Sequence, residues 1–346
     1  MNLKRVTIWC VVYFVSLCGV LWFLQFFKPI QTTFIRPRIF FTLWQEQAVD
    51  NHFVIKEIVR HLVTKEYGNY EILQRGPRYY ERCVNKQDLH LIAWKHFPLP
   101  IECMKEQTFL WQLESPISIT VPPSDIYKNR FHKIFTYHRS STNGQNVIYT
   151  PIPYTYHRIL KNYDLKSKQY LVSLVGKYSE YHHYRLRRDS IVWFLKNHPN
   201  DIRFFGHDWQ NILKYLSDAE QEKFKIQYGG YISDKFEEIS KSKFVLAYEN
   251  FRFNDYITEK IYDVMAAGSV PIYSGAPNIR EHIPQSCFID FHAFQSYEEL
   301  YDFLVNMSDD TYNDYLDCIK DFMAEPESHP NHYKNVAQII LYHMTE

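Results

Sequence analysis

Residues 241–275, KSKFVLAYENFRFNDYITEKIYDVMAAGSVPIYSG, change their hydrophobic period twice. Residues 243–248 form a short apolar run that is typical of a strand buried in a parallel sheet. From Ile257 apolar residues recur at helical spacing as far as Gly268, which suits a helix end, and residues 270–273 are apolar again. The stretch therefore predicts a βαβ unit of an open α/β fold, in which ligands bind at the carboxyl edge of the sheet.

The loop that leaves the first strand and the first turn of the helix carry an unusual set of polar side chains. They are Glu249, Asn250, Tyr256, Glu259 and Lys260. Together with the free N–H groups and the positive dipole end of a helix start, they would hold an anionic ligand such as a phosphate. A solvated loop followed by helix-surface charges is the alternative that this pattern alone leaves open.

Length and charge narrow the class of protein. A chain of 346 residues predicts about two domains, and its 46% hydrophobic content is enough for sizeable cores. Lys+Arg and Asp+Glu number 39 each, so the chain has no net basic field to recruit nucleic acid. We therefore expect no nucleic-acid partner.

Residues 6–27 contain no charged side chain and are long enough, at about 1.5 Å rise per residue, to cross a hydrocarbon layer of about 30 Å. Lys4 and Arg5 precede them, which predicts a cytoplasmic tail at 1–5 and places the remainder outside or in a lumen. We expect a single-pass type II membrane protein whose anchor is followed by a stem at 28–37. A cleaved signal peptide is the alternative, but the run exceeds a typical h-region and no A-x-A-like site follows it.

The cysteines leave their pairing open. Cys10 and Cys18 lie in the predicted anchor and are expected to act as small apolar residues. The remaining cysteines are Cys83, Cys103, Cys287 and Cys318. In an oxidising compartment four cysteines allow three complete pairings, and the sequence does not choose among them. Asn306 begins the N-glycosylation sequon, which would be used only in a eukaryotic secretory setting.

The first half of the chain predicts a small α/β domain over residues 38–160. Short apolar strands are expected at 38–44, 70–73, 89–94 and 108–113, and a helix at 53–63. Glu114 follows the last of these strands, in a strand-end loop where catalytic side chains are often displayed. An isolated glutamate at such a place is more often a surface acid, so the pattern alone assigns it no role.

The second half predicts another α/β domain over residues 161–325 and a C-terminal segment at 326–346. It begins with a polar linker at 161–168 and an apolar strand at 170–175, and further helices are expected at 296–307 and 309–323. The basic residues Arg185, Arg187 and Arg188 precede a helix and, by themselves, could simply be solvated.

Residues 248–278, YENFRFNDYITEKIYDVMAAGSVPIYSGAPN, resemble the signature of the α1,3-fucosyltransferases, glycosyltransferase family 10. Residues 114–116 (ESP), 135–140 (FTYHRS) and 151–154 (PIPY) resemble further motifs of that family in the same order, although His138 interrupts a Tyr-Arg pair and Thr155 stands where glycine is common. The resemblance implies a GT-B-like α/β fold, with two Rossmann-like domains that face a cleft. In this chain an N-terminal transmembrane helix would precede them.

The resemblance also implies a reaction, the inverting transfer of L-fucose from GDP-fucose in α1,3 or α1,4 linkage to a GlcNAc-containing glycan or glycoprotein. It implies that Glu114 is the base for the acceptor hydroxyl. Arg188 and Lys260 would stabilise the GDP leaving group, and Arg185 is the fallback for the arginine position. The residues implied to bind substrate are Glu249, Asn250, Tyr256, Glu259, Lys235 and Arg185.

The chain contains no D-x-D triplet. Two fixed cations would take the place of a divalent metal, so we expect no required cofactor, although a metal could still assist. Two alternatives stay open: a non-catalytic sugar-binding protein on the same fold, and a transferase with another nucleotide sugar or a protein-linked acceptor. In a eukaryotic host the expected location is the Golgi membrane, with the catalytic part in the lumen.

Overall fold

The computed structural model describes residues 38–43, 54, 56–58, 71–75, 89–94, 107–113, 131–156, 158–160, 167–181 and 184–345. The predicted anchor at 6–27, Glu114, Cys83 and Cys103 lie outside the described residues. Within the described part of the chain, no helix is both long and apolar enough to cross a membrane.

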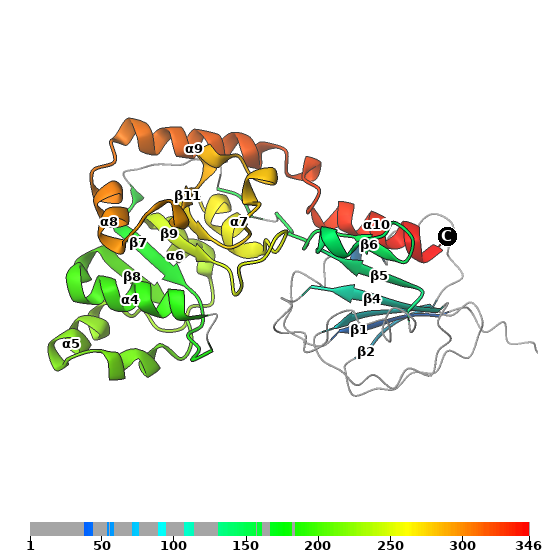
Figure 1. Cartoon of the computed structure of the whole chain (residues 1–346), viewed down its shortest axis with the longest axis horizontal. Helices are drawn as coiled ribbons and strands as arrows, with labels where there is room; N and C mark the ends of the chain where they lie inside the picture. The colour runs from blue at the N-terminus through cyan, green and yellow to red at the C-terminus, as the bar shows by residue number, and fades with distance from the viewer. Residues whose placement is uncertain are drawn as a thin grey trace, which may run out of the picture.

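Six parallel strands form a first sheet in the order β2-β1-β3-β4-β5-β6 (Figure 1). They are β1 (Arg38–Leu43), β2 (Glu71–Arg75), β3 (Leu89–Trp94), β4 (Thr108–Gln112), β5 (Lys133–Thr136) and β6 (Val147–Tyr149). The strands predicted from the apolar runs of the first half correspond to β1 to β4 and are confirmed. In β4 the consecutive residues Phe109, Leu110 and Trp111 are all buried, as expected for a strand of a parallel sheet with both faces covered.

Five parallel strands form a second sheet in the order β11-β10-β9-β7-β8. They are β7 (Tyr170–Val175), β8 (Ile202–Phe205), β9 (Ser242–Tyr248), β10 (Val270–Ser274) and β11 (Ile289–Asp290). The helices of this unit are α4 (Arg185–Asn197), α5 (Asp218–Gln227), α6 (Lys235–Ser240), α7 (Glu259–Ala266), α8 (Tyr297–Val305) and α9 (Asp309–Ala324). The predicted βαβ unit is β9-α7-β10 and is confirmed.

The connections that leave β7 and β9 move in opposite directions across the sheet. From β7 the chain passes through α4 to β8 on one side, whereas from β9 it passes through α7 to β10 on the other. The two strands are neighbours, so their carboxyl ends open a crevice between diverging connections. Such a topological switch point is where open α/β sheets bind ligands.

Two crossover segments connect the sheets: the first runs from β6 to β7, and the second from α9 to the C-terminal helix. They lie side by side at Tyr154 and His332. Tyr154 forms a parallel β-bridge with His332. The N–H of Tyr154 donates to the carbonyl of Asn331 at 2.8 Å, and the N–H of Tyr333 donates to the carbonyl of Tyr154 at 3.0 Å. Tyr154 and Tyr156 are buried in the core of the second unit, although they belong to the range predicted for the first domain.

The C-terminal helix α10 (Tyr333–Thr345) returns to the first sheet (Figure 1). Its buried residues Val336, Ala337, Ile340 and Met344 recur at helical spacing. They share a core with Phe109, Trp111 and Phe135 from β4 and β5. The segment 326–346 therefore completes the core of the first unit.

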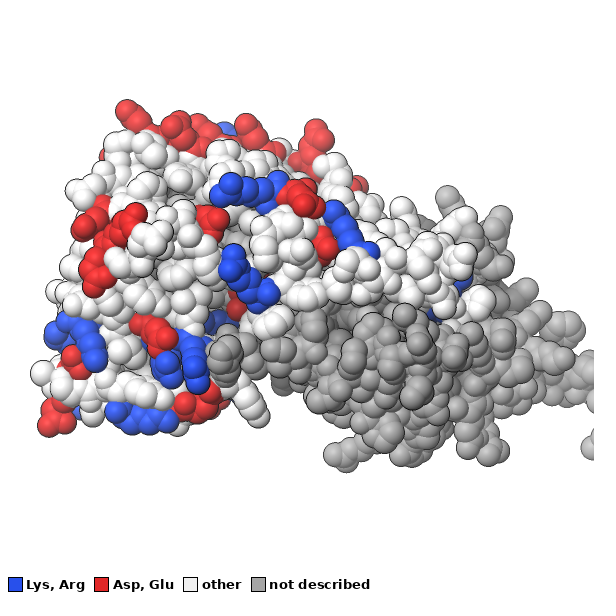
Figure 2. Space-filling model, viewed as in Figure 1, with Lys and Arg blue, Asp and Glu red and all other residues white. Residues whose placement is uncertain are grey.

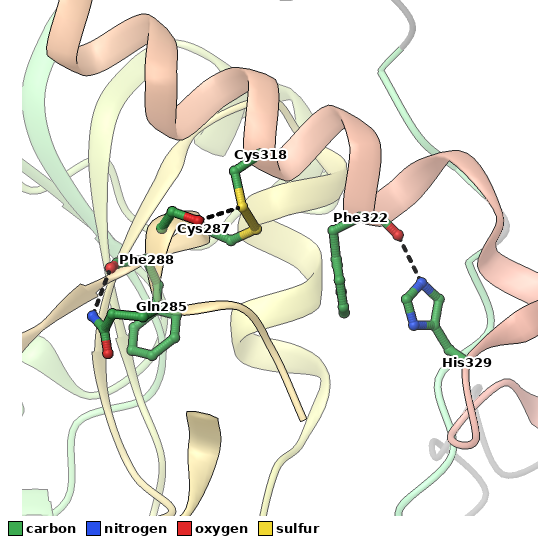
Figure 3. The surroundings of a disulfide bond; sticks show 7 residues. Gln285, Cys287, Phe288, Cys318, Phe322 and His329 are labelled. Carbon is green, nitrogen blue, oxygen red and sulfur yellow. Dashed lines mark hydrogen bonds between the residues drawn. A yellow bond between two sulfur atoms is a disulfide. The ribbon is translucent and has the colours of Figure 1, made fainter. Parts of the chain in front are cut away.

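Helix α9 is amphipathic. Its inner face buries Tyr312, Leu316, Ile319 and Met323, and acidic side chains gather on its outer face (Figure 2). Cys318 on the same helix forms a disulfide with Cys287, in the turn before β11 (Figure 3). The sequence left the partners of these two cysteines open, and the structure pairs them with each other.

Candidate active site

A cavity of about 340 Å³ lies at the carboxyl edge of the second sheet, where β7 and β9 end. Its polar lining comes from the ends of these strands and from the starts of three helices. The lining includes Gly176, Lys177, Arg187, Lys235, Asn250, Glu259, Lys260 and Asp263. The volume lies within the range of small-molecule sites, about 300–1,000 Å³. The cavity thus occupies the switch point of the sheet and gathers several cations there.

Glu249 lies behind the cavity wall, at the start of α7. One carboxylate oxygen accepts the Thr258 N–H at 2.7 Å, and the other accepts the Thr258 hydroxyl at 2.7 Å. The Lys260 ammonium is 3.2 Å from the second oxygen, and the Glu249 side chain has no exposed area. Glu249 therefore caps the helix and holds Lys260. Thr258 has an extended backbone, with φ of −107° and ψ of −172°, so the helix begins at Glu259, two residues after the predicted start.

Lys260 and Glu259 carry opposite charges in the cavity wall. Burial by itself lowers the pKa of Lys260, but the carboxylates of Glu249 and Glu259 outweigh it and leave this pKa above that of an ordinary lysine. Burial by itself raises the pKa of Glu259, but Lys260 and Lys235 outweigh it and lower this pKa to about 2. Both groups are therefore charged at neutral pH.

Arg187 is the buried arginine of the site. Its Nη2 donates to the Tyr248 carbonyl at 2.6 Å and to the Asn250 side-chain oxygen at 2.8 Å. The guanidinium also lies over the ring of Tyr184, 4.9 Å from its centroid. These contacts fix the guanidinium plane at the end of β9, where it is part of the cavity wall.

The structure places the other two arginines outside the cavity wall. Arg188 pairs with its neighbour Asp189, with Nη2 2.7 Å from the carboxylate, and lies over Tyr215. Arg185 is exposed at the first residue of α4. The position expected for Arg188 is thus taken by Arg187. Each helical residue is rotated by about 100° from the last, and Arg187 shares the buried face of Ser190, Ile191 and Phe194.

Lys235, expected to bind substrate, lies in the cavity wall. Its ammonium is 2.5 Å from one carboxylate oxygen of Asp263, and the other oxygen accepts the Tyr154 hydroxyl at 2.9 Å. Burial raises the pKa of Asp263, against the opposing effect of Lys235.

Tyr256 lies at the seam between the two units rather than in the cavity wall. It is 2% exposed, and its ring centroid is 5.4 Å from that of Tyr137 in the first unit. The adjacent Asp255 has a left-handed backbone, with φ of 63°, and a buried carboxylate. Among the described residues, Asp255, Glu281 and His282 form a group that could hold a metal ion, because a carboxylate oxygen or ring nitrogen of each lies within 4.8 Å of the others.

Nitrogen atoms of three side chains already contact the carboxylate of Asp255. The Asn278 amide donates to it at 3.0 Å, and His282 Nε2 and Arg139 Nε lie at 3.1 Å and 3.4 Å. The Arg139 guanidinium also contacts Glu281 at 3.2 Å. The Arg139 guanidinium thus lies between the carboxylates of Asp255 and Glu281. Because Arg139 belongs to the first unit, these residues form an ion-pair junction between the two units.

Reasoning from sequence did not identify three polar residues of the cavity wall. Arg187 could have been found from the phase of its helix, and Lys177 from its place after Gly176 at the end of a predicted strand. Asp263 lies one helical turn after Glu259, which is the signal that would have found it.

Solved structures share this fold at low sequence identity. A structure described as "Crystal Structure of alpha1,3-Fucosyltransferase with GDP" is similar with a TM-score of 0.53 and 14% identity, and the match covers 90% of each chain. A glycosyltransferase from Rickettsia africae ESF-5 is similar with a TM-score of 0.59 and 8% identity, over 90% of this chain and 99% of the other. The architecture is therefore a GT-B-like glycosyltransferase fold.

The sequence specifies the family within that fold. Residues 165–339 match the family described as "Glycosyltransferase family 10 (fucosyltransferase) C-term". A match of 247 residues is 28% identical to mouse 4-galactosyl-N-acetylglucosaminide 3-alpha-L-fucosyltransferase 9, and covers 67% of this chain but 58% of that protein. A 79-residue match is 40% identical to alpha-(1,4)-fucosyltransferase of Arabidopsis thaliana, and covers 22% of this chain and 20% of that protein. The chain belongs to glycosyltransferase family 10, the family that its motifs resemble.

Proposed function

We propose that this protein is a fucosyltransferase that uses GDP-fucose as its donor. The observation that carries the proposal is the cavity at the switch point, where Arg187, Lys260 and Lys235 converge. Fixed cations of this kind suit the diphosphate of a nucleotide sugar, and a guanidinium can hold phosphate oxygens in pairs. Membership of the family supports fucose as the sugar, and one fold neighbour is described as containing GDP.

In the proposed reaction, charge develops on the departing diphosphate. The Arg187 guanidinium and the Lys260 ammonium are held in place by protein contacts before any ligand arrives, so they stabilise this charge without reorganisation. Arg187 takes the role that the motif register assigned to Arg188. Asn250 and Glu259 in the cavity wall would contact the ribose or the sugar, and Lys235 a phosphate.

The acceptor side of the proposal rests on Glu114, which lies outside the described residues. In the sequence it follows β4 by two residues. We propose that Glu114 is the base that deprotonates the acceptor hydroxyl, with inversion at the fucose carbon and α1,3 or α1,4 linkage to a GlcNAc-containing glycan. No cofactor would be required.

We also propose that residues 6–27 anchor the protein in a membrane as a type II protein. In a eukaryotic cell this would be the Golgi membrane, with the catalytic part lumenal. The apolar run and the preceding Lys4 and Arg5 support this proposal.

The test compares Arg187→Ala with the matched variant Arg188→Ala. Turnover of GDP-fucose with a glycan acceptor panel should fall at least about 100-fold in Arg187→Ala, because one fixed donor to the leaving group is lost. Arg188→Ala should stay within about twofold of the parent, because that guanidinium pairs with Asp189. Equal losses in the two variants would contradict the assignment, and turnover of GDP-mannose or UDP-sugars as fast as GDP-fucose would reject the donor.

A further inference from the structure

Asp263 joins the cavity to the crossover between the two units. It lines the cavity on α7, and its two carboxylate oxygens have different partners. One is 2.5 Å from the Lys235 ammonium, and the other accepts the Tyr154 hydroxyl at 2.9 Å. Since a carboxylate has a fixed shape, the Tyr154 hydroxyl helps to decide how Asp263 presents its other oxygen to Lys235.

Tyr154 is held firmly in the crossover itself. Its backbone is hydrogen-bonded on both sides to the second crossover segment, at Asn331 and Tyr333. Its ring stacks on Tyr262 of α7, with centroids 5.1 Å apart. The Tyr154 side chain therefore contacts the helix that carries the cavity residues, while its backbone is hydrogen-bonded to the segment that leads to α10, which packs on the first sheet.

We propose that Tyr154 is a positioning residue for the donor site: acting through Asp263, it sets the place of the Lys235 ammonium and so links diphosphate affinity to the interdomain crossover. This inference rests on the proposed function, because it takes the cavity to be the diphosphate site. A carboxylate that accepts a hydrogen bond from a hydroxyl attracts a neighbouring ammonium less strongly. The Lys235 ammonium therefore stays able to contact a phosphate. Without that hydroxyl, Asp263 holds Lys235 more tightly.

The neighbouring Tyr156 provides a matched control. It is also buried in the crossover, at 7% exposure against 5% for Tyr154, but its hydroxyl donates to Asn331 at 3.0 Å. Tyr154→Phe and Tyr156→Phe each remove one buried hydroxyl from the same segment. Of these two hydroxyls, that of Tyr154 donates to a carboxylate of the cavity, whereas that of Tyr156 donates to an amide oxygen.

The experiment is calorimetric titration of the whole 346-residue chain with GDP. Tyr154→Phe should weaken GDP binding about three- to tenfold, and Tyr156→Phe less than about twofold. Adding Tyr154→Phe to Lys235→Met should weaken binding by less than about twofold more, because the lysine through which Tyr154 acts is already absent. Thermal unfolding of the two tyrosine variants should be alike.

Other results separate this inference from the proposed function. Equal effects of the two tyrosine variants, or additive effects of Tyr154→Phe and Lys235→Met, would overturn the positioning role while GDP binding by the parent protein upholds the site. Absence of GDP binding by the parent protein would reject the proposed function itself. If Tyr154→Phe unfolds at the titration temperature, Asp263→Asn replaces it. Non-additivity of that variant with Lys235→Met supports the step from Asp263 to Lys235, and additivity overturns the inference.

Discussion

Glu249 affects the cavity although its side chain lies behind the wall. It holds Lys260 and the N–H of Thr258, the residue before α7, with the same carboxylate. The space for this carboxylate depends on Gly275, where a Cβ atom would lie 2.5 Å from the Glu249 side chain and 2.2 Å from the Tyr273 hydroxyl. The glutamate and the glycine of the motif therefore belong to one packing arrangement that positions a lysine.

Glu249→Gln should lower both the free energy of unfolding and the turnover of GDP-fucose. The new amide would present a donor group to the Thr258 N–H or to Lys260, and Lys260 would lose one counter-charge. We expect a loss of about 2 kcal/mol in urea unfolding and at least about a tenfold loss of turnover.

Glu237→Gln is the control for this change, because Glu237 pairs with Lys241 at the surface, where its side chain is 64% exposed. That variant should unfold within about 0.5 kcal/mol of the parent protein. A Glu249→Gln protein as stable and as active as Glu237→Gln would show that the buried carboxylate does not hold Lys260 as described.

Helices α6 and α7 end at a shared lysine on the side of the sheet away from the cavity. The Lys168 ammonium donates to the Ser240 carbonyl at 2.8 Å and to the Gly268 carbonyl at 2.6 Å, and also contacts the Ser269 hydroxyl. A cation suits the negative ends of the two helix dipoles. No carboxylate appears among these partners, and burial lowers the pKa of Lys168 to about 8.

This lowered pKa predicts a pH dependence of stability. Between about pH 8 and the ordinary lysine pKa of about 10.5, the unfolded state binds more protons at Lys168 than the folded state. The contribution of Lys168 to the free energy of unfolding therefore rises with pH across this window and is constant below it. Urea unfolding from pH 7 to 9.5 should show that the parent protein gains up to about 1 kcal/mol per pH unit relative to Lys168→Met. Parallel pH profiles would contradict the lowered pKa.

The two units of the molecule meet through consecutive residues of the loop after β5. Tyr137 contacts Tyr256, and the His138 ring lies 4.5 Å from that of Phe253. Arg139 reaches the Asp255 junction described above. His138, which interrupts the family motif, thus lies at the seam, beside the loop that leads into α7.

Arg139→Met should loosen the contact between the two units. The guanidinium is 47% exposed, so we expect a loss of only about 1 kcal/mol, or about a fivefold shift toward open forms. Small-angle X-ray scattering of the GDP-free protein should show a larger radius of gyration. Arg280→Met removes the same charge from a pair within the second unit, with Asp290, and should leave the radius unchanged. The same radius in both variants would contradict the role of Arg139 at the seam.

The local pattern predicted β9, α7 and β10 because each has its own hydrophobic period, and it placed the first four strands for the same reason. It missed the start of α7 by two residues, because Thr258, which is hydrogen-bonded to Glu249 at the preceding strand end, has an extended backbone. The motif register pointed to Arg188, with Arg185 as the fallback, whereas the structure places Arg187 in the cavity wall. Adjacent helical residues differ by about 100° in direction, and the motif register does not resolve one step.

The sequence by itself determines the elements, the family and the loop that carries the polar residues of the site, because these depend on short-range periods and on contiguous motifs. Long-range packing decides the rest. It selects the Cys287–Cys318 bond, brings α10 back to the first sheet and turns Arg187 toward the cavity. The stretch 241–275 encodes the polar residues of β9 and α7, but Arg187, Lys235 and Tyr154 come from segments that only the folded chain brings beside it.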